Sequence, residues 1–383
     1  MMPLQSFRLR RSFLVLGLVP GLMMAMALLA SCSQRGGEAL ALLDSFSGSQ
    51  RADSPVITRE SGRLDSEQGD FEVDVYKRAD EQVRANLLLI PGVTPQGRDD
   101  PRLMEFAELL AQARFRVTVP ELPNLRELKV SAEDIASIDS LLMRLSKQAS
   151  AESRPLGLVA ISYAAGPALI AASQAEPENR PDFMLAIGGY YSTENVVRYF
   201  TTGAFRTPED QDWQEGRPHP QARWLFLRAN ADRLDNTGDV LALRRLAARK
   251  LQGPNAGNAA VHSQLTAQGR AVLALLENDD PERVEEGIDA LPESLRAELS
   301  ALNLADRPLD AVDFPVLLLH GRDDPVIPYS ESLRLAEALP EGMAEVTLTE
   351  GLMHVDMSDS RISDGLRLYD LTVRLLELRD AVE

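Results

Sequence analysis

Residues 156–172, LGLVAISYAAGPALIAA, contain a serine at a position suited to nucleophilic chemistry. An apolar run too short for a helix ends at Ile161, Ser162 follows, and small residues then lead into an apolar helical pattern. This order predicts a strand, a sharp turn and a helix, with the hydroxyl of Ser162 standing out at the turn. The first N–H groups of such a helix have no internal partners, so they can receive a developing oxyanion.

The residues around Ser162 are small, as a tight turn requires. Ala160 and Ala164 flank it at two residues' distance, so the chain has A-I-S-Y-A where the common signature is G-x-S-x-G. Small residues at this spacing also arise by chance in alanine-rich helices. From this stretch alone, a nucleophile and an ordinary serine at a strand-to-helix turn are both open interpretations.

The composition describes an acidic chain that is able to build a sizeable core. Of its 383 residues, 44% are apolar and 26% are charged, which is typical of globular proteins. The formal charge is −18, and the first 32 residues contain three arginines and no acidic residue, so the remainder is more acidic still. Such a body repels phosphates, and we expect no nucleic-acid partner.

The sequence contains few cysteines and histidines that could form a disulfide or bind a metal ion. Cys32 is the single cysteine, so no intrachain disulfide can form. The chain has four histidines, and no pair has the spacing of a helical metal motif. We expect neither a metal ion nor another cofactor.

Residues 1–32 have the features of an export signal. Three arginines precede an apolar run at residues 13–30, and the segment ends in L-A-S-C with Cys32 last. This ending resembles the lipobox of bacterial lipoproteins. The resemblance implies a signal peptide over 1–32, a fatty-acyl anchor such as palmitate on Cys32, and, with Ser33 next, an outer-membrane protein facing the periplasm. A single transmembrane helix is the alternative interpretation, although glycines and a proline interrupt the run.

The chain after this signal divides into a tether and an α/β region. Residues 33–67 are rich in Ser, Gly, Arg and Asp and are predicted to be a tether with one short helix near 39–46. In residues 68–191, short apolar strands alternate with helical patterns, which predicts a mostly parallel sheet with helices on both faces. The expected strands are 70–76, 85–90, 115–119, 156–161 and 183–187, and expected helices include 101–113 and 131–149, the latter with a capping box formed by Ser131 and Asp134.

A mostly helical block interrupts this alternation at residues 192–307. Its helical patterns cover 241–251, 261–277 and 292–302, while 223–228 is open between strand and helix. The alternation resumes in residues 308–383, with strands at 315–319 and 345–349 and helices at 330–339 and 364–381. We therefore expect one sheet built from 68–191 and 308–383, with 192–307 inserted as a helical cap.

Two later loops contain residues suited to acid–base chemistry. The strand at 315–319 is followed by H-G-R-D-D-P-V-I-P, and the strand at 345–349 by E-G-L-M-H, which ends at His354. With Ser162 before them, these loops make the chain resemble the α/β-hydrolase fold family, whose nucleophile elbow, H-G-x-x-D-x-x-V/I-P acid loop and histidine loop follow in this order. The resemblance covers residue 86 to the C-terminus without the cap, and it implies an α/β-hydrolase fold and serine hydrolase activity.

The resemblance assigns each of these residues a role. Ser162 is the expected nucleophile, and His354 is the base that takes its proton and later returns it as an acid. Asp324 is the expected acceptor that orients the imidazole, because the acid of the family directly precedes the proline. Its neighbour Asp323 is the alternative, and Asp356 is a weaker substitute.

The oxyanion hole is expected to use the backbone N–H groups of Val93 and Tyr163. The family often has H-G at the first of these turns, where this chain has P-G, and the chain also lacks an H-G-G-G run.

The other three histidines are weaker candidates for a catalytic role. We expect His320 to pack within the acid loop, and His219 and His262 to lie on the surface of the cap.

The predicted function is hydrolysis of a carboxylic ester, either a lipid or a short acyl ester, through an acyl-enzyme. Two alternatives are open: an amide or peptide hydrolase with the same triad, and a lipid-anchored binding protein without turnover. The expected partners are a small-molecule ester or lipid substrate and, through Cys32, the membrane. The sequence leaves the oligomeric state undefined.

Overall fold

The computed structural model describes residues 34–45, 55–66, 69–80, 82–253, 259–350 and 362–381. The predicted signal peptide with Cys32, and the loop with His354 and Asp356, lie outside the described residues. Within the described ranges, no helix is both long and apolar enough to cross a membrane.

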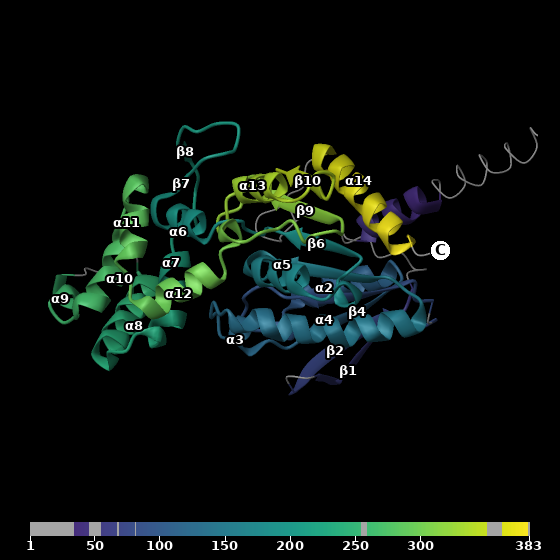
Figure 1. The fold of residues 1–383 in the computed structure, drawn as a ribbon, viewed down its shortest axis with the longest axis horizontal. Coiled ribbons are helices and arrows are strands. Elements are labelled where there is room, and N and C mark those ends of the chain that lie inside the picture. Colours follow the sequence, from purple (N-terminus) through teal and green to yellow (C-terminus); the bar gives the residue numbers. More distant parts are fainter. Residues whose placement is uncertain are drawn as a thin grey trace, which may run out of the picture.

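An eight-stranded sheet lies at the centre of the molecule (Figure 1). Its strands are β1 (Ile57–Ser66), β2 (Gly69–Arg78), β3 (Ala85–Ile90), β4 (Phe115–Pro120), β5 (Leu156–Ile161), β6 (Phe183–Ile187), β9 (Val316–Gly321) and β10 (Ala344–Thr349). They are arranged in the order β1-β2-β4-β3-β5-β6-β9-β10. The β1–β2 and β2–β4 pairs are antiparallel, and all other neighbours are parallel. The mostly parallel sheet predicted from the sequence is confirmed.

The inner strands are buried on both faces, which explains their unbroken apolar sequences. Every residue of β3, β5, β6 and β9 is buried. Because side chains alternate between the faces of a strand, Leu88 and Ile90 join one apolar cluster while Leu87 and Leu89 join another. The sheet thus separates two cores, each covered by its own helices.

The helices divide between the two faces of the sheet (Figure 1). One core contains apolar residues of α4 (Glu133–Glu152), α5 (Ala165–Gln174) and α13 (Ser330–Ala338). The other contains those of α2 (Pro101–Gln112) and α14 (Ile362–Arg379). These helices on both faces, together with the order of the strands, give the chain the α/β-hydrolase fold that its sequence predicts.

Two helix starts test the expected capping. Asp100 caps α2 by accepting a hydrogen bond from the N–H of Arg102 at 3.0 Å, with proline at the first helical position. The capping box predicted for α4 is wrong. Ser131 does accept a bond from Glu133 N–H at 3.3 Å, but the carboxylate of Asp134 turns to Asn124 Nδ2 and the hydroxyl of Tyr163.

The short helix expected near 39–46 is present at residues 34–45, but the rest of the prediction for 33–67, a tether, is wrong over the part that the structure describes. Ala39 and Leu42 of this helix are buried in the same core as α14. The side chain of Arg379, 1% exposed, forms an ion pair with Glu38 at 2.6 Å. Residues 57–66 form β1, an edge strand that is mostly exposed, so its polar sequence is similar to that of a linker.

Between β6 and β9 the chain leaves the sheet and forms a helical block at one end of the molecule (Figure 1). It contains α6 (Thr193–Thr202), α7 (Ala222–Asn230), α8 (Thr237–Gln252), α9 (Ala259–His262), α10 (Ala267–Glu277), α11 (Val284–Asp289), α12 (Glu293–Ala301) and a two-stranded hairpin of β7 (Ala204–Phe205) and β8 (Gln214–Glu215). The segment 223–228, open in the sequence, belongs to α7. The block has an apolar cluster of its own, with Leu243, Leu246 and Leu273 buried at its centre.

Candidate active site

Ser162 lies at the turn between β5 and α5, and its backbone is strained. Its φ is +56°, in the left-handed region, whereas Ile161 before it is extended and Ala165 after it is helical. A non-glycine residue held there costs about 1–3 kcal/mol and persists only where the surrounding fold enforces it. Such strain is typical of functional sites. The predicted strand, turn and helix therefore occur with Ser162 at the bend.

The turn fits only because its neighbours lack side-chain bulk. A Cβ on Gly166, the second residue of α5, would lie 2.1 Å from the hydroxyl of Tyr190. At the end of β6, Gly188 has a φ of +61°, and a Cβ there would lie 3.3 Å from Oδ2 of Asp324. The glycine at the end of β6 thus lets the loop after β9 approach the edge of the sheet at which β5 also ends.

The loop after β9 distinguishes its two aspartates. Asp323 is exposed, whereas Asp324 is 2% exposed. Oδ1 of Asp324 accepts hydrogen bonds from the N–H groups of Val326 at 2.7 Å and Ile327 at 3.0 Å. The hydroxyl of Tyr199, on α6, donates to the carbonyl oxygen of Asp324 at 2.9 Å. The carboxylate of Asp324 is therefore fixed in orientation by its own loop, while the cap holds the backbone of the same residue.

His320 is a structural residue of this loop. Its side chain is fully buried, with Nδ1 2.7 Å from Oγ of Ser332 and Nε2 3.0 Å from the carbonyl oxygen of Ile327. Nε2 also lies 3.6 Å from Oδ2 of Asp324. The ring thus holds the start of α13 against the acid loop.

Ser162 opens into a cavity of about 290 Å³ between the sheet and the cap. Its walls are mostly apolar and combine core and cap residues: Val93, Leu128, Val130, Tyr163, Tyr190, Thr193, Val196, Val197, Phe200, His219, Ala222, Leu225, Phe226, Leu299, Val326 and Ile327. The hydroxyl of Tyr190 donates to the carbonyl oxygen of Leu302 at 3.0 Å. Val93 and Tyr163, whose N–H groups are the expected oxyanion donors, share this wall with Ser162.

A second, smaller hollow of about 80 Å³ lies on another side of Ser162. Val93 and Ser162 line both spaces, but the smaller one also contains Thr94, Asp100 and Arg102. Arg102 forms an ion pair with Asp100 at 2.9 Å, and Thr94 donates to the same carboxylate at 2.9 Å. Ser162 therefore lies between two mostly apolar spaces, of which the smaller one has a polar side formed by Thr94, Asp100 and Arg102.

His219 is a site residue that the sequence analysis assigned to the surface. It is exposed, but it also lines the cavity that contains Ser162. Its backbone N–H donates to the carbonyl oxygen of Pro325 at 2.7 Å, which ties this part of the cap to the acid loop. Its Nδ1 accepts a bond from Gln221 N–H at 3.3 Å. No feature of the local sequence indicates this position, because it depends on a contact across more than 100 residues.

Residues 128–132, which we call the strap, connect the turn of Ser162 to the cap. Tyr163 binds the backbone of Ser131 through its hydroxyl. On the cap side, Asn230 accepts from Val130 N–H at 3.1 Å, and Glu298 accepts from Ala132 N–H at 2.8 Å. The strap is thus held from both sides of the cavity.

A buried carboxylate lies beside the strap. Burial raises the pKa of Asp134 to about 6, although hydrogen bonds from Asn124 and Tyr163 act in the opposite direction. Burial likewise raises the pKa of Tyr163 well above its usual value, so its hydroxyl stays protonated and can donate. Among the residues that the structure describes, no group of three or more His, Cys, Asp or Glu side chains could hold a metal ion.

Comparisons with known proteins identify relatives by structure only. No protein family and no curated protein matches the sequence. An acylaminoacyl peptidase from Pyrococcus horikoshii aligns over 85% of this chain and 42% of its own length, at 12% identity and a TM-score of 0.45. An α/β-hydrolase superfamily protein from Enterococcus faecalis aligns over 84% and 99%, at 15% identity and a TM-score of 0.45. A soluble variant of the monoglyceride lipase of Saccharomyces cerevisiae aligns over 86% and 97%, at 15% identity and a TM-score of 0.44.

These similarities concern the fold alone. The chain spans less than half the length of the acylaminoacyl peptidase and nearly all of the other two proteins. The proposals for the chemistry of this chain therefore rest on its own residues.

Proposed function

We propose that the protein is a serine hydrolase that cleaves a carboxylic ester, with Ser162, His354 and Asp324 as its triad. The observation that carries the proposal is the strained backbone of Ser162, whose φ of +56° sets this residue at the end of β5 in the wall of a cavity. Strain of this kind is kept where a side chain must be presented in one direction.

The chemistry follows from the residue types. Oγ of Ser162 attacks the ester carbonyl carbon while His354 takes its proton, and the N–H groups of Val93 and Tyr163 stabilise the oxyanion. The intermediate collapses, the alcohol leaves with the proton from His354, and water then hydrolyses the acyl-enzyme by the same steps. Asp324 orients the imidazole.

The two hollows beside Ser162 favour an ester with an apolar acyl group. The apolar cavity of about 290 Å³ suits the acyl group, and the smaller space, with Thr94 and Arg102 on one side, suits a small alcohol. A peptide would bury N–H and C=O groups against walls that offer few partners, at a cost of about 1–3 kcal/mol for each unpaired group. We therefore favour esters over peptides as substrates.

A fluorophosphonate probe tests the proposal, because it reacts only with an activated serine. The purified chain is expected to be labelled on the peptide that contains Ser162, and to hydrolyse nitrophenyl butyrate. Ser162→Ala should lose both properties with an unchanged circular dichroism spectrum. A folded protein without labelling would instead support a binding function, and faster cleavage of matched amides would support a peptidase.

We further propose that a lipid on Cys32 attaches the protein to the membrane, in the outer membrane facing the periplasm. The sequence L-A-S-C at the single cysteine supports this location. Several acyl chains hold a protein firmly where one binds only marginally. Cells fed an alkyne fatty acid should label the wild type but not Cys32→Ala, which should be released or mislocalised. Equal labelling of the two proteins would reject the proposal.

A further inference from the structure

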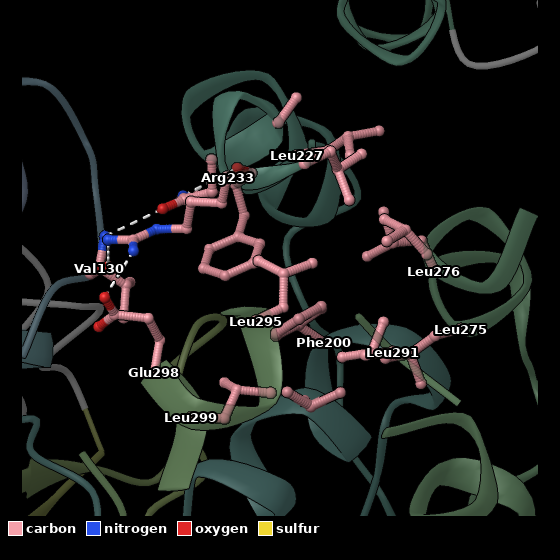
Figure 2. A pocket seen from close by; sticks show the side chains of 16 residues that line it. Val130, Phe200, Leu227, Arg233, Leu275, Leu276, Leu291, Leu295, Glu298 and Leu299 are labelled. Atoms are coloured by element: carbon pink, nitrogen blue, oxygen red, sulfur yellow. Dashed lines mark hydrogen bonds and ion pairs between the residues drawn. The ribbon is translucent and has the colours of Figure 1, made fainter. Parts of the chain in front are cut away.

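The cap contains a second apolar hollow, of about 60 Å³ (Figure 2), which adjoins the cavity of Ser162. Five residues line both spaces: Val130, Val197, Phe200, Phe226 and Leu299. The two spaces are therefore adjacent and share part of their walls. Phe200 and Phe226 lie at this junction, with their ring centroids 5.8 Å apart.

The wall of this distal hollow is built from leucines of α7, α10 and α12 and the segment before α12. Figure 2 shows Leu227, Leu275, Leu276, Leu291 and Leu295 around it. These side chains come from the helices that also form the core of the cap. Protein interiors are normally packed without voids of this size, so an apolar space beside a reactive serine needs an explanation.

The polar side chains at the edge of the hollow are occupied by other partners. Arg233 forms an ion pair with Glu298 at 2.6 Å and donates to the carbonyl oxygen of Val130 (Figure 2). Glu298 and Asn230 accept hydrogen bonds from N–H groups of the strap. Their polar atoms are thus directed to residues 128–132, and a ligand in the hollow meets mainly hydrocarbon. An apolar cavity of this kind stays dry and binds hydrocarbon.

We propose that the distal hollow binds the methyl end of an unbranched acyl chain whose carboxyl end reacts with Ser162. This inference rests on the proposed function and specifies its substrate class as esters of medium-length to long linear acids. The Phe200 and Phe226 rings, with centroids 5.8 Å apart, form part of the wall between the two spaces. A linear chain needs a smaller displacement of these rings to pass than a branched or aromatic acyl group does, so only the linear chain reaches the hollow. The chain must fill the cavity of about 290 Å³ before it enters the hollow, so butyrate ends short of it.

Filling the hollow tests this inference. Leu295 is only partly buried, so Leu295→Trp places a large side chain there with little disturbance of the core of the cap. The ratio of kcat/KM for nitrophenyl dodecanoate to that for the butyrate should fall about tenfold, since each methylene removed from an apolar site weakens binding about fourfold. Leu241→Trp, at an exposed position on α8, is the matched control and should keep the wild-type ratio.

A second variant and a second measurement complete the test on the full chain. Leu295→Ala enlarges the hollow and should move the preferred chain length upward. Calorimetry of dodecanoate with Ser162→Ala, alone and combined with Leu295→Trp, measures binding without turnover, and the double variant should bind about tenfold more weakly. Unchanged ratios and unchanged binding would overturn the inference while leaving Ser162-dependent hydrolysis of butyrate intact. Loss of ester hydrolysis in every variant and in the wild type would instead reject the proposed function.

Discussion

The hydroxyl of Tyr163 holds both polar groups of the Ser131 backbone, accepting from its N–H at 2.9 Å and donating to its carbonyl oxygen at 3.1 Å. Tyr163 directly follows Ser162, so the proposed oxyanion donor carries the side chain that fixes the strap. Ser131 is 3% exposed, so without the hydroxyl its N–H would lose this partner without gaining water, while its carbonyl oxygen would keep the bond from the N–H of Asp134.

Tyr163→Phe is therefore expected to weaken the protein and its chemistry together. The loss of two bonds to buried backbone groups should lower the free energy of unfolding by about 1–3 kcal/mol. We expect kcat on nitrophenyl butyrate to fall more than KM rises, since the N–H of residue 163 acts on the transition state. Urea titration and steady-state kinetics measure the two effects. Tyr76→Phe is the control, because the buried hydroxyl of Tyr76 has no hydrogen-bond partner within the described residues.

The two neighbouring aspartates should differ sharply in their effect on turnover. Asp324→Asn is expected to lower kcat on the order of 10⁴-fold, as loss of the orienting acid does in other triads. Asp323→Asn, at the exposed position, should lower it less than threefold. The rate on nitrophenyl butyrate decides between them. If the exposed residue proved essential and the buried one dispensable, the acid would have been assigned to the wrong position.

A parallel comparison concerns the histidines. His354→Ala should reduce turnover on the order of a million-fold, because the base and the nucleophile act as one unit. His219→Gln should have a much smaller effect, mainly on KM, since His219 lines the cavity at its exposed side. Combining His354→Ala with Ser162→Ala should cause no further loss. A reversed order of the two histidine variants would assign the base to the cap.

Asp134 should give the protein a pH-dependent stability. Its pKa is raised from 3.8 to about 6 in the folded state, so the folded protein binds the proton more tightly than the unfolded chain. The resulting stabilisation is complete below about pH 4 and is lost as the pH rises through 6. Relative to Asp134→Asn, the wild type should lose about 2 kcal/mol between pH 4 and pH 7. A difference that stays constant over this range would contradict the raised pKa.

Arg379 should be the residue that docks the helix at 34–45. It binds Glu38, Asp380 and the carbonyl oxygen of Ala113. Arg379→Met removes a partner of the Ala113 carbonyl oxygen and of Glu38, whereas Asp380 keeps its ion pairs with Arg35 and Arg84. We therefore expect a loss of about 1–3 kcal/mol and faster hydrogen exchange at 34–45. Arg374→Met, which removes a surface pair with Glu345, should cost less than about 1 kcal/mol. Equal losses in the two variants would argue against docking by Arg379.

The inner strands of the sheet could be predicted because their burial is visible in their own sequence. A parallel strand buried on both faces must be an apolar run, and 85–90, 156–161 and 183–187 all have this form. β1 could not be predicted, because ITRESGRLDS has neither alternation nor an apolar face. Its stability comes from pairing with β2 along ten residues, which is a property of the partner strand.

The site residues also fall into two groups, those that the local sequence predicts and those that it does not. The bend at Ser162 follows from the small residues beside it, and the proline after Asp324 distinguishes that residue from its neighbour. The position of His219 depends on one backbone hydrogen bond to Pro325, and the hydrogen bonds between Tyr163 and Ser131 join residues 32 positions apart. Neither contact leaves a periodic pattern in the sequence. The same is true of α7, whose short apolar run W-L-F-L fits a strand as well as a helix.

The docked helix at residues 34–45 limits the distance between the proposed lipid anchor and the folded protein. Two peptide bonds separate Cys32 from residue 34, a reach of about 7 Å at most. With a lipid on Cys32, the folded protein would stay close to the bilayer surface and diffuse laterally with its lipid. Figure 1 shows the cap at the far end of the molecule from this helix. The cap would thus be held at the end of the molecule opposite to the anchored residue.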